Sequence, residues 1–297
     1  MILRRVRMLI LVVCLAPGLA VAEEIRKEFH ESFDVSKGAV LELHCGDGDV
    51  TLTPWDQDRI QVDVQYHADI IKIGLGSRPS FDVSFHHSGD RVVAKEQIKG
   101  SMTVGFYSHS RIAYTWDIKA PAWVGLEFHG DDGDIRITGW KADIELMLDD
   151  GDLDLSDITA GSVRINLDDG DVEGREIDAA LQIHGDDGDI RITGLTCPEI
   201  QLATDDGDID IDFNGPAPNR LTASTDDGDI RFLFPAQASF AYEIETDDGP
   251  IRLRLPDGSD AGREEKAGGG KVSGAVGGGS GLVQIRTDDG MVELIAE

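Results

Sequence analysis

The side chains of this sequence that could do chemistry are aspartates, and most of them belong to one phrase, Asp-Asp-Gly-Asp, that recurs along the chain. Carboxylate oxygens are the ligands that calcium and other hard cations prefer, so rows of such phrases predict a cation-binding edge with calcium as the candidate ion. A second interpretation, which we favour, needs no ordered ion. One aspartate of each phrase caps a chain turn by accepting backbone N–H groups, and the others form a hydrated acidic edge with diffuse counterions. The candidate metal ligands are Asp131, Asp132, Asp134, Asp149, Asp150, Asp152, Asp168, Asp169, Asp171, Asp186, Asp187, Asp189, Asp205, Asp206, Asp208, Asp226, Asp227 and Asp229.

The phrase repeats with a period of about 20 residues, which indicates a repeat architecture. In each copy, apolar residues lie seven and five positions before the glycine and two positions after it, as Leu181, Ile183 and Ile190 do around Gly188. Apolar residues two positions apart are typical of half-buried strands, so each glycine is expected at a corner between two strands. The glycines of the copies are Gly48, Gly133, Gly151, Gly170, Gly188, Gly207, Gly228, Gly249 and Gly290.

Two all-β folds satisfy this pattern. One has a β-hairpin at every Asp-Gly; the other is a single-stranded parallel β-helix, or β-solenoid, with coils of about 18–21 residues. A hairpin places the first aspartate of the phrase directly opposite the last one, and like charges opposite each other in a strand pair repel. Each period also has one strong corner signal instead of two. We therefore expect the solenoid and keep the hairpin array as the alternative.

The remainder of the chain is organised around this array. Residues 1–22 have the charged start, apolar stretch and small-residue end of a secretory signal peptide, so the chain is expected to be exported. Residues 23–57 contain the first copy, and 58–120 alternate apolar and polar residues in longer strands, with antiparallel pairing as the candidate arrangement. The regular array is expected over 121–256. Residues 257–297 are expected to form a glycine-rich flexible loop and a terminal copy that closes the array.

Charge and cysteine content restrict the partners further. A net charge of −30 argues against nucleic acid and anionic lipid and favours cationic or basic partners. After the leader, no apolar run approaches membrane-spanning length. Cys45 takes an inward position in the first copy, where a buried small hydrophobe is favoured over a disulfide with Cys197.

The sequence predicts a protein that is not an enzyme. The alternative is a polysaccharide-active β-helix enzyme, because carboxylate pairs can do acid–base chemistry on sugars. The corners are short and uniform, however, and aromatic residues make up only 6% of the chain, so a sugar-reading catalytic cleft is not expected. The histidines have no metal-ligand spacing: His129 and His184 are three coils apart, and the adjacent His86 and His87 point to opposite strand faces.

Several weak motifs occur in an order that resembles a known family. The chain has an early Gly-Asp-Gly-Asp-Val at 46–50 followed by Trp55-Asp56, then a strand ending in Trp-Asp-Ile-Lys-Ala-Pro at 116–121. Repeated Gly-Asp-Ile units and a late glycine-rich segment follow. Together they resemble the bacterial adhesin-like domain family, an exported β-strand-repeat domain of unknown function. The resemblance covers nearly all of the chain after the leader, and it implies a β-helical, non-enzymatic envelope or surface protein.

We therefore expect an exported, adhesin-like β-solenoid in the periplasm, at the cell surface or secreted. Its acidic aspartate edge is the expected structural or binding surface, and its expected partner is an envelope or surface component of cationic character. The alternative function is a calcium-binding repeat protein whose aspartate rows coordinate the ion.

Overall fold

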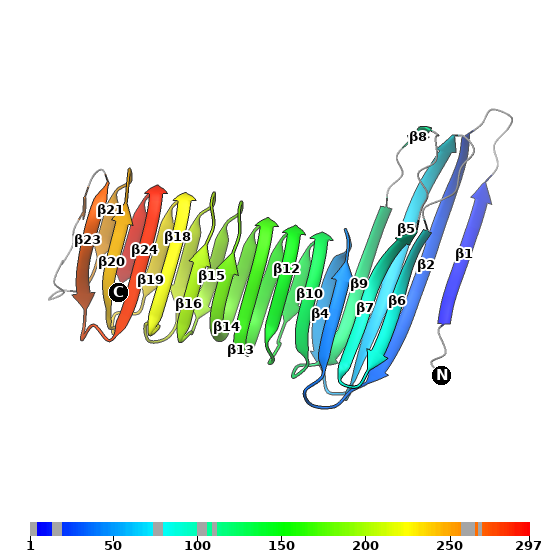
Figure 1. Cartoon of the computed structure of the whole chain (residues 1–297), viewed down its shortest axis with the longest axis horizontal. Helices are drawn as coiled ribbons and strands as arrows, with labels where there is room; N and C mark the ends of the chain where they lie inside the picture. Colours follow the sequence, from blue (N-terminus) through cyan, green and yellow to red (C-terminus); the bar gives the residue numbers. More distant parts are fainter. Residues whose placement is uncertain are drawn as a thin grey trace. The chain divides into compact units, whose positions relative to one another are not determined.

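The structure, a computed structural model, describes residues 5–13, 20–73, 80–99, 106–108, 112–256, 265–266 and 269–297, and the regular elements in these ranges are all strands (Figure 1). The chain divides into two compact units, Met1–Asp134 and Ile135–Glu297, here called the N-terminal unit and the array unit. The strands of the array unit are β11 (Ile135–Thr138), β12 (Ile144–Asp150), β13 (Leu153–Asp169), β14 (Val172–His184), β15 (Ile190–Leu195), β16 (Glu199–Ala203), β17 (Ile209–Phe213), β18 (Arg220–Asp227), β19 (Ile230–Phe234), β20 (Phe240–Thr246), β21 (Ile251–Arg254), β22 (Glu265–Lys266), β23 (Gly270–Val276), β24 (Gly281–Asp289) and β25 (Val292–Ala296).

The array unit is a solenoid in which each coil contributes one strand before the Asp-Asp-Gly-Asp corner and one after it. Equivalent strands of neighbouring coils pair in parallel, so that Val163 lies opposite Ile144 on one side and Leu181 on the other. β13 and β14 continue around the second corner and contribute to both faces. This parallel pairing confirms the predicted β-solenoid. The hairpin alternative is wrong, because it requires the two strands at each Asp-Gly to pair antiparallel with each other.

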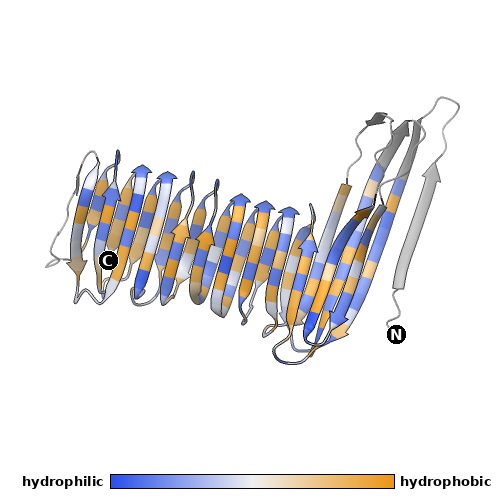
Figure 2. Ribbon diagram, in the orientation of Figure 1, coloured by the Kyte–Doolittle hydropathy of each residue, from blue (hydrophilic) through white to orange (hydrophobic). Residues whose placement is uncertain are grey.

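The core of the array unit lies between the two faces. The residues five positions before the glycines are buried, and Ile165, Ile183 and Leu202 among them are at most 1% exposed. Figure 2 shows the resulting alternation of hydrophilic and hydrophobic residues along the strands. Each fully buried side chain of this kind contributes about 1.5–3 kcal/mol, and it is buried only because the next coil covers it.

The last copy of the phrase lies inside the array instead of at its end. β24 pairs in parallel with β18 on one side and β20 on the other, and β25 lies between β19 and β21 in the same way (Figure 1). The prediction that this copy closes the array is therefore wrong. β23 pairs antiparallel with β20, and β22 with β21, so the predicted glycine-rich loop contains two strands. Residues 257–264 and 267–268 of that segment lie outside the described ranges.

Charges on the outer face fit this unusual coil order. Glu293 of β25 lies opposite Arg231 of β19 and Arg252 of β21 in the strand register. Its side chain is 2.9 Å from the Nη2 atom of Arg254 and 4.0 Å from the Nε atom of Arg231. If the coils followed the order of the chain, Arg231 would lie directly opposite Arg252, and like charges opposite each other destabilise a strand pair. The electrostatics of this face therefore favour inserting β25 between the two.

The N-terminal unit combines long antiparallel strands with the first two copies of the phrase. β2 pairs antiparallel with β5, β5 with β9, and β6 with β7, whereas β3 pairs in parallel with β7 and β10, and β4 with β9. This confirms the antiparallel arrangement predicted for the longer strands. The strands of this unit are β1 (Arg5–Val13), β2 (Ala20–Asp34), β3 (Val40–Cys45), β4 (Asp49–Trp55), β5 (Arg59–Ile73), β6 (Ser80–Ser88), β7 (Arg91–Lys99), β8 (Phe106–Ser108), β9 (Ile112–Pro121) and β10 (Gly125–Asp132).

An aromatic cluster fills the core between these long strands. The ring centroids of Tyr66 and Phe81 are 4.4 Å apart, and those of Phe81 and Tyr114 are 4.9 Å apart. Phe29 completes the cluster with an edge-to-face contact to Phe81 at 5.8 Å. Aromatic pairs in these arrangements add about 0.5–1.5 kcal/mol beyond the area they bury, so the cluster holds the two layers of the N-terminal unit together.

The predicted leader forms a strand in the uncleaved chain. The sequence places residues 1–22 outside the fold, whereas Arg5–Val13 form β1, antiparallel to β2. Cleavage after Ala22 stays a prediction and would remove β1 and the first residues of β2. Among the residues that the structure describes, no helix has the length and apolar character needed to cross a membrane.

Candidate functional site

The Asp-Asp-Gly-Asp corners are built on a column of glycines. A Cβ atom added to Gly188 would lie under 3.0 Å from the carbonyl oxygen of Gly170, and one added to Gly207 would meet the carbonyl of Gly188 in the same way. Main-chain hydrogen bonds continue through the column; for example, the Gly188 amide donates to the Asp206 carbonyl at 3.0 Å. A side chain at these positions would push neighbouring coils apart, which explains why glycine recurs at each corner.

The aspartate that follows each glycine has a structural task. The Oδ1 atom of Asp171 accepts a hydrogen bond from the Asp189 amide of the next coil at 2.9 Å. Asp189 accepts in turn from the Asp208 amide, and Asp208 from the Asp229 amide, both at 2.8 Å. In the N-terminal unit, Asp49 and the Asp134 amide form the equivalent contact at 3.4 Å. This row therefore satisfies backbone donors that the corner leaves without a strand partner.

This ladder ends where the backbone donors end. Asp229 accepts from the Met291 amide at 2.7 Å, because the coil of β24 and β25 is its neighbour. Met291 has no carboxylate, but the residue at the same position of the next coil is Pro250, which has no N–H group to satisfy. The two copies that lack the third aspartate are therefore the last two coils in space.

The ladder makes a prediction that separates hydrogen bonding from charge. Asp208→Ala is expected to lower the free energy of unfolding by about 1 kcal/mol, because the Asp229 amide loses its acceptor. Asp208→Asn keeps an acceptor oxygen and should change it little. Asp206→Ala is the control, with an expected change within about 0.5 kcal/mol. Urea unfolding followed by circular dichroism measures all three, and equal effects of Asp208→Ala and Asp208→Asn would show that the charge, and not the acceptor, matters.

In four consecutive coils, the two aspartates before the glycine have no comparable task. They are exposed, and none of their side chains makes a hydrogen bond or ion pair within the described part of the chain. Coils stack about 4.8 Å apart, and two unit charges at about this distance repel by roughly 1 kcal/mol in water. These eight carboxylates, here called the paired aspartates, are Asp168, Asp169, Asp186, Asp187, Asp205, Asp206, Asp226 and Asp227.

The predicted ligands belong to both compact units of the chain. Asp131, Asp132 and Asp134 belong to the N-terminal unit, where Asp131 and Asp132 face Asp47 of the first copy. Burial, followed by the charges of Asp132 and Asp131, raises the pKa of Asp47. The other predicted ligands all lie along the corner edge of the array unit. Within the described residues, the one group of three metal-ligating side chains whose donor atoms lie within 4.8 Å of one another consists of residues outside the aspartate rows, Glu24, His67 and Asp69.

Side chains of the longer strands hold the first corner, and sequence reasoning missed them. The carboxylate of Glu96 accepts hydrogen bonds from the Gly46 amide at 2.8 Å and the Tyr114 hydroxyl at 3.0 Å, while that hydroxyl accepts from the Asp47 amide at 2.6 Å. Burial raises the pKa of Glu96. These contacts join the corner that follows β3 to β7 and β9, and because these two strands are about 50 and 67 residues further along the chain, no local pattern reveals the contacts.

A second missed feature is a row of threonines three positions before the glycines of the last four coils. Thr204 donates to the Asp186 carbonyl at 2.9 Å, and Thr225 donates to the Asp205 carbonyl at 3.1 Å. The signal was present in the sequence, because threonine occurs at this position in each of these four copies and in none of the earlier ones. The buried threonines are Thr204, Thr225, Thr246 and Thr287.

The described cysteines and two of the described histidines pack against their neighbours. Cys45 and Cys197 are free and buried, as expected for Cys45, and burial raises the pKa of the Cys197 thiol to about 11. The rings of His44 and His129 stack at 4.8 Å because β3 pairs with β10. The two planes are 10° from parallel, so the in-plane nitrogen lone pairs do not converge on one ion.

Comparison with known proteins gives a family. No curated protein matches the chain. Among solved structures, a candidate adhesin of Bacteroides fragilis is 15% identical with a TM-score of 0.43, and the match covers 90% of this chain and 97% of that one. A candidate cell adhesion protein of Clostridium sporogenes is 10% identical with a TM-score of 0.26, covering 90% and 99%. Likeness at this level says nothing about what the present chain binds.

The family model gives a firmer result. The model described as Toastrack DUF4097 matches residues 125–294, which is more than half of the 297 residues. The match begins at the strand before the second copy of the phrase and includes most of the inserted last coil, β24 and β25. It confirms the family resemblance that the sequence motifs indicated. The chain belongs to the Toastrack DUF4097 family.

Proposed function

We propose that this chain is a non-enzymatic, exported, adhesin-like component of the cell envelope, and that its paired aspartates bind a cationic partner surface. One observation carries the proposal. Backbone amides of the next coil use the third aspartates, such as Asp171, Asp189 and Asp208, as acceptors, whereas the side chains of the paired aspartates are exposed and make no hydrogen bond or ion pair within the described residues. Carboxylates that repel one another and accept no backbone hydrogen bond lower the stability of the fold. Their repetition therefore favours a binding function over a structural one.

The corner edge presents these charges on a rigid support. Main-chain bonds hold successive corners together, including Asp187 amide to Asp168 carbonyl at 2.9 Å and Asp206 amide to Asp186 carbonyl at 3.0 Å. The charges are therefore held at the strand spacing of about 4.8 Å. A regular row of negative charge raises the association rate with a basic partner and fixes how the partner's positive charges align along the row.

The uniformity of the corners supports a binding role over catalysis. General acid–base chemistry needs two titratable groups whose environments separate their pKa values. The paired aspartates instead repeat with the same neighbours from coil to coil. A surface of equivalent charges is suited to an extended partner.

The test compares two variants of equal charge. In the edge variant, Asp186, Asp187, Asp205 and Asp206 are changed to Asn; in the control variant, four exposed acids on the sheet faces are changed to Gln. The probe is a fluorescent decalysine peptide, titrated by anisotropy at two salt concentrations. We expect the edge variant to bind at least about tenfold more weakly than the control variant, because it removes a contiguous row. Equal affinities would show that only net charge matters and would overturn the proposal. The control positions are Glu145, Glu173, Glu176 and Glu199.

Calcium binding by the same aspartates stays a prediction, and thermal unfolding of the two variants and the parent chain tests it. A rise in melting temperature that is specific to calcium over magnesium and sodium chloride, and that is lost in the edge variant, would support ordered ions. A rise that salt alone reproduces would support diffuse counterions.

A further inference from the structure

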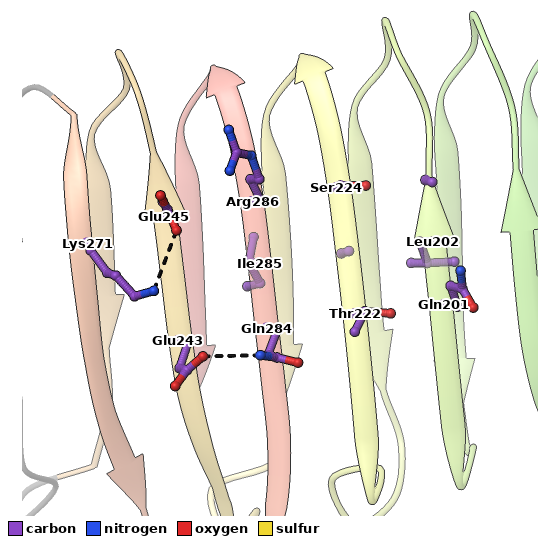
Figure 3. A pocket seen from close by; sticks show the side chains of 12 residues that line it. Gln201, Leu202, Thr222, Ser224, Glu243, Glu245, Lys271, Gln284, Ile285 and Arg286 are labelled. Atoms are coloured by element: carbon purple, nitrogen blue, oxygen red, sulfur yellow. Dashed lines mark hydrogen bonds and ion pairs between the residues drawn. The ribbon is translucent and has the colours of Figure 1, made fainter.

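The outer face of the array unit has a hollow beside the corner edge, lined by residues other than the paired aspartates. It has a volume of about 370 Å³ and extends over β16, β18, β24, β20 and β23 (Figure 3). Pockets of roughly 300–1,000 Å³ are the size that binds small molecules and oligomer segments. Because five neighbouring strands are about 4.8 Å apart, the hollow is about 19 Å long, which suits a chain-like ligand better than a compact one.

The hollow arises from the sizes of the outward side chains. Ala203 of β16 and Thr222 and Ser224 of β18 are short and form its floor. Gln284 and Arg286 of β24 are long and form a wall beside them. If β18 carried outward side chains as long as those of β24, this part of the face would be flat. The hollow therefore exists because the inserted coil places β24, with its long side chains, next to β18.

The hollow is polar but locally neutral. Lys271 Nζ lies 3.5 Å from a carboxylate oxygen of Glu245, and the Gln284 amide donates to Glu243 at 3.1 Å. With Arg286, the lining has two cations and two carboxylates, in a chain whose net charge is −30. A basic peptide is expected to bind the aspartate edge in preference to this hollow, and the overall negative charge of the chain disfavours binding of an anionic polymer.

The floor also offers hydrogen-bonding groups that the protein does not use. Within the described residues, the hydroxyls of Thr222 and Ser224 and the amide of Gln201 make no side-chain hydrogen bond. Hydroxyls and amides are both donors and acceptors, so they match a ligand whose groups also act as both. Figure 3 shows these side chains around the hollow, with the Lys271–Glu245 and Gln284–Glu243 pairs at one side.

We propose that this hollow binds a neutral, hydroxyl-rich chain, a saccharide oligomer. Such a ligand needs many weak donors and acceptors, no net charge and an elongated site, and the lining meets each requirement. The contact is a binding subsite with no reaction. It is independent of the proposed function of the aspartate edge, because the two surfaces share no residue.

The test uses neutral linear oligosaccharides as probes: pentamers of β-1,4-glucose, α-1,4-glucose and β-1,4-N-acetylglucosamine, titrated by calorimetry and by chemical-shift perturbation. We expect at least one to bind and Ser224→Trp, which fills the floor, to weaken it at least tenfold. Gln201→Ala combined with Gln284→Ala removes amide contacts without filling space and should weaken it by a smaller factor. Asn166→Trp, at the equivalent outward position of β13, is the matched control and should leave binding unchanged.

Three outcomes would overturn the proposal. One is that no neutral pentamer binds at millimolar concentration. Another is that binding survives Ser224→Trp while circular dichroism shows that the variant is folded. The third is that a decalysine peptide or an oligogalacturonate binds the hollow more tightly than the neutral pentamers. The Asn edge variant should bind the pentamers like the parent chain, so a failure here and a failure of the edge proposal can be told apart.

Discussion

Gly188→Ala is expected to lower the free energy of unfolding of the array unit by about 3 kcal/mol or more. The new Cβ would lie under 3.0 Å from the carbonyl oxygen of Gly170, and Gly188 has φ +133°, where residues with side chains are strained. Overpacking costs about 1–3 kcal/mol, and a disfavoured backbone conformation adds about 1–3 kcal/mol. The clashing atom belongs to the backbone, so relief requires two coils to separate.

Urea unfolding monitored by circular dichroism measures this effect. Gly278→Ala is the control, because the nearest atom to its new Cβ is the Ser239 hydroxyl oxygen at 3.5 Å and the backbone is not left-handed there. Its expected change is within about 0.5 kcal/mol. If the two substitutions cost the same, glycine at the corners serves some purpose other than close coil contact.

Ending the chain after Ser280 is expected to detach the coil of β20 and β21 from the array. The truncation removes β24 and β25, so β20 and β21 lose their parallel partners, and β18 and β19 each lose one of two. Core side chains such as Phe232 and Tyr242, which are at most 1% exposed in the intact chain, then lose covering residues. Burying each such side chain is worth about 1.5–3 kcal/mol, so the end of the array should unfold locally while the earlier coils persist.

Hydrogen exchange measured by mass spectrometry gives the readout. Amides of 240–254 should exchange at near-unfolded rates in the truncated chain, whereas those of 163–183 should stay protected. A synthetic peptide of residues 281–297, added in trans, should restore protection. Glu297→Ala in the full chain is the control, since that side chain is exposed. Unchanged protection at 240–254 would mean that the last coil contributes little to the array.

The repeat and its core could be predicted because their signals are local. Apolar alternation on both sides of each glycine identified the inward residues, including Ile165 and Ile183, and the corner at Gly188. The choice of solenoid over hairpins was decided by the even repeat length, with one strong corner signal in each period instead of two. The use of the third aspartate was only partly foreseen: capping explained one carboxylate per copy, but the acceptor ladder depends on the spacing between coils.

The features that the sequence did not reveal depend on pairing between distant segments. β24 belongs beside β18 because of contacts between residues about 60 positions apart, and the repeat pattern alone favours stacking in chain order. Two signals were nevertheless present. Pro250 cannot donate to Asp229, whereas Met291 can, and Glu293 relieves the repulsion that Arg231 and Arg252 would otherwise suffer.

The position of the last coil also affects how the chain can fold during its synthesis. β24 and β25 are made after β20 and β21, yet they lie between those strands and the rest of the array. Coil-by-coil growth from the N-terminus therefore stops at β18 and β19, and their open edges wait for residues that the ribosome adds about 60 positions later. Unpaired strand edges are the surfaces on which chains join one another wrongly. Strand exchange between neighbouring nascent chains is therefore most favoured after residue 234 has been synthesised and before residue 296 has been.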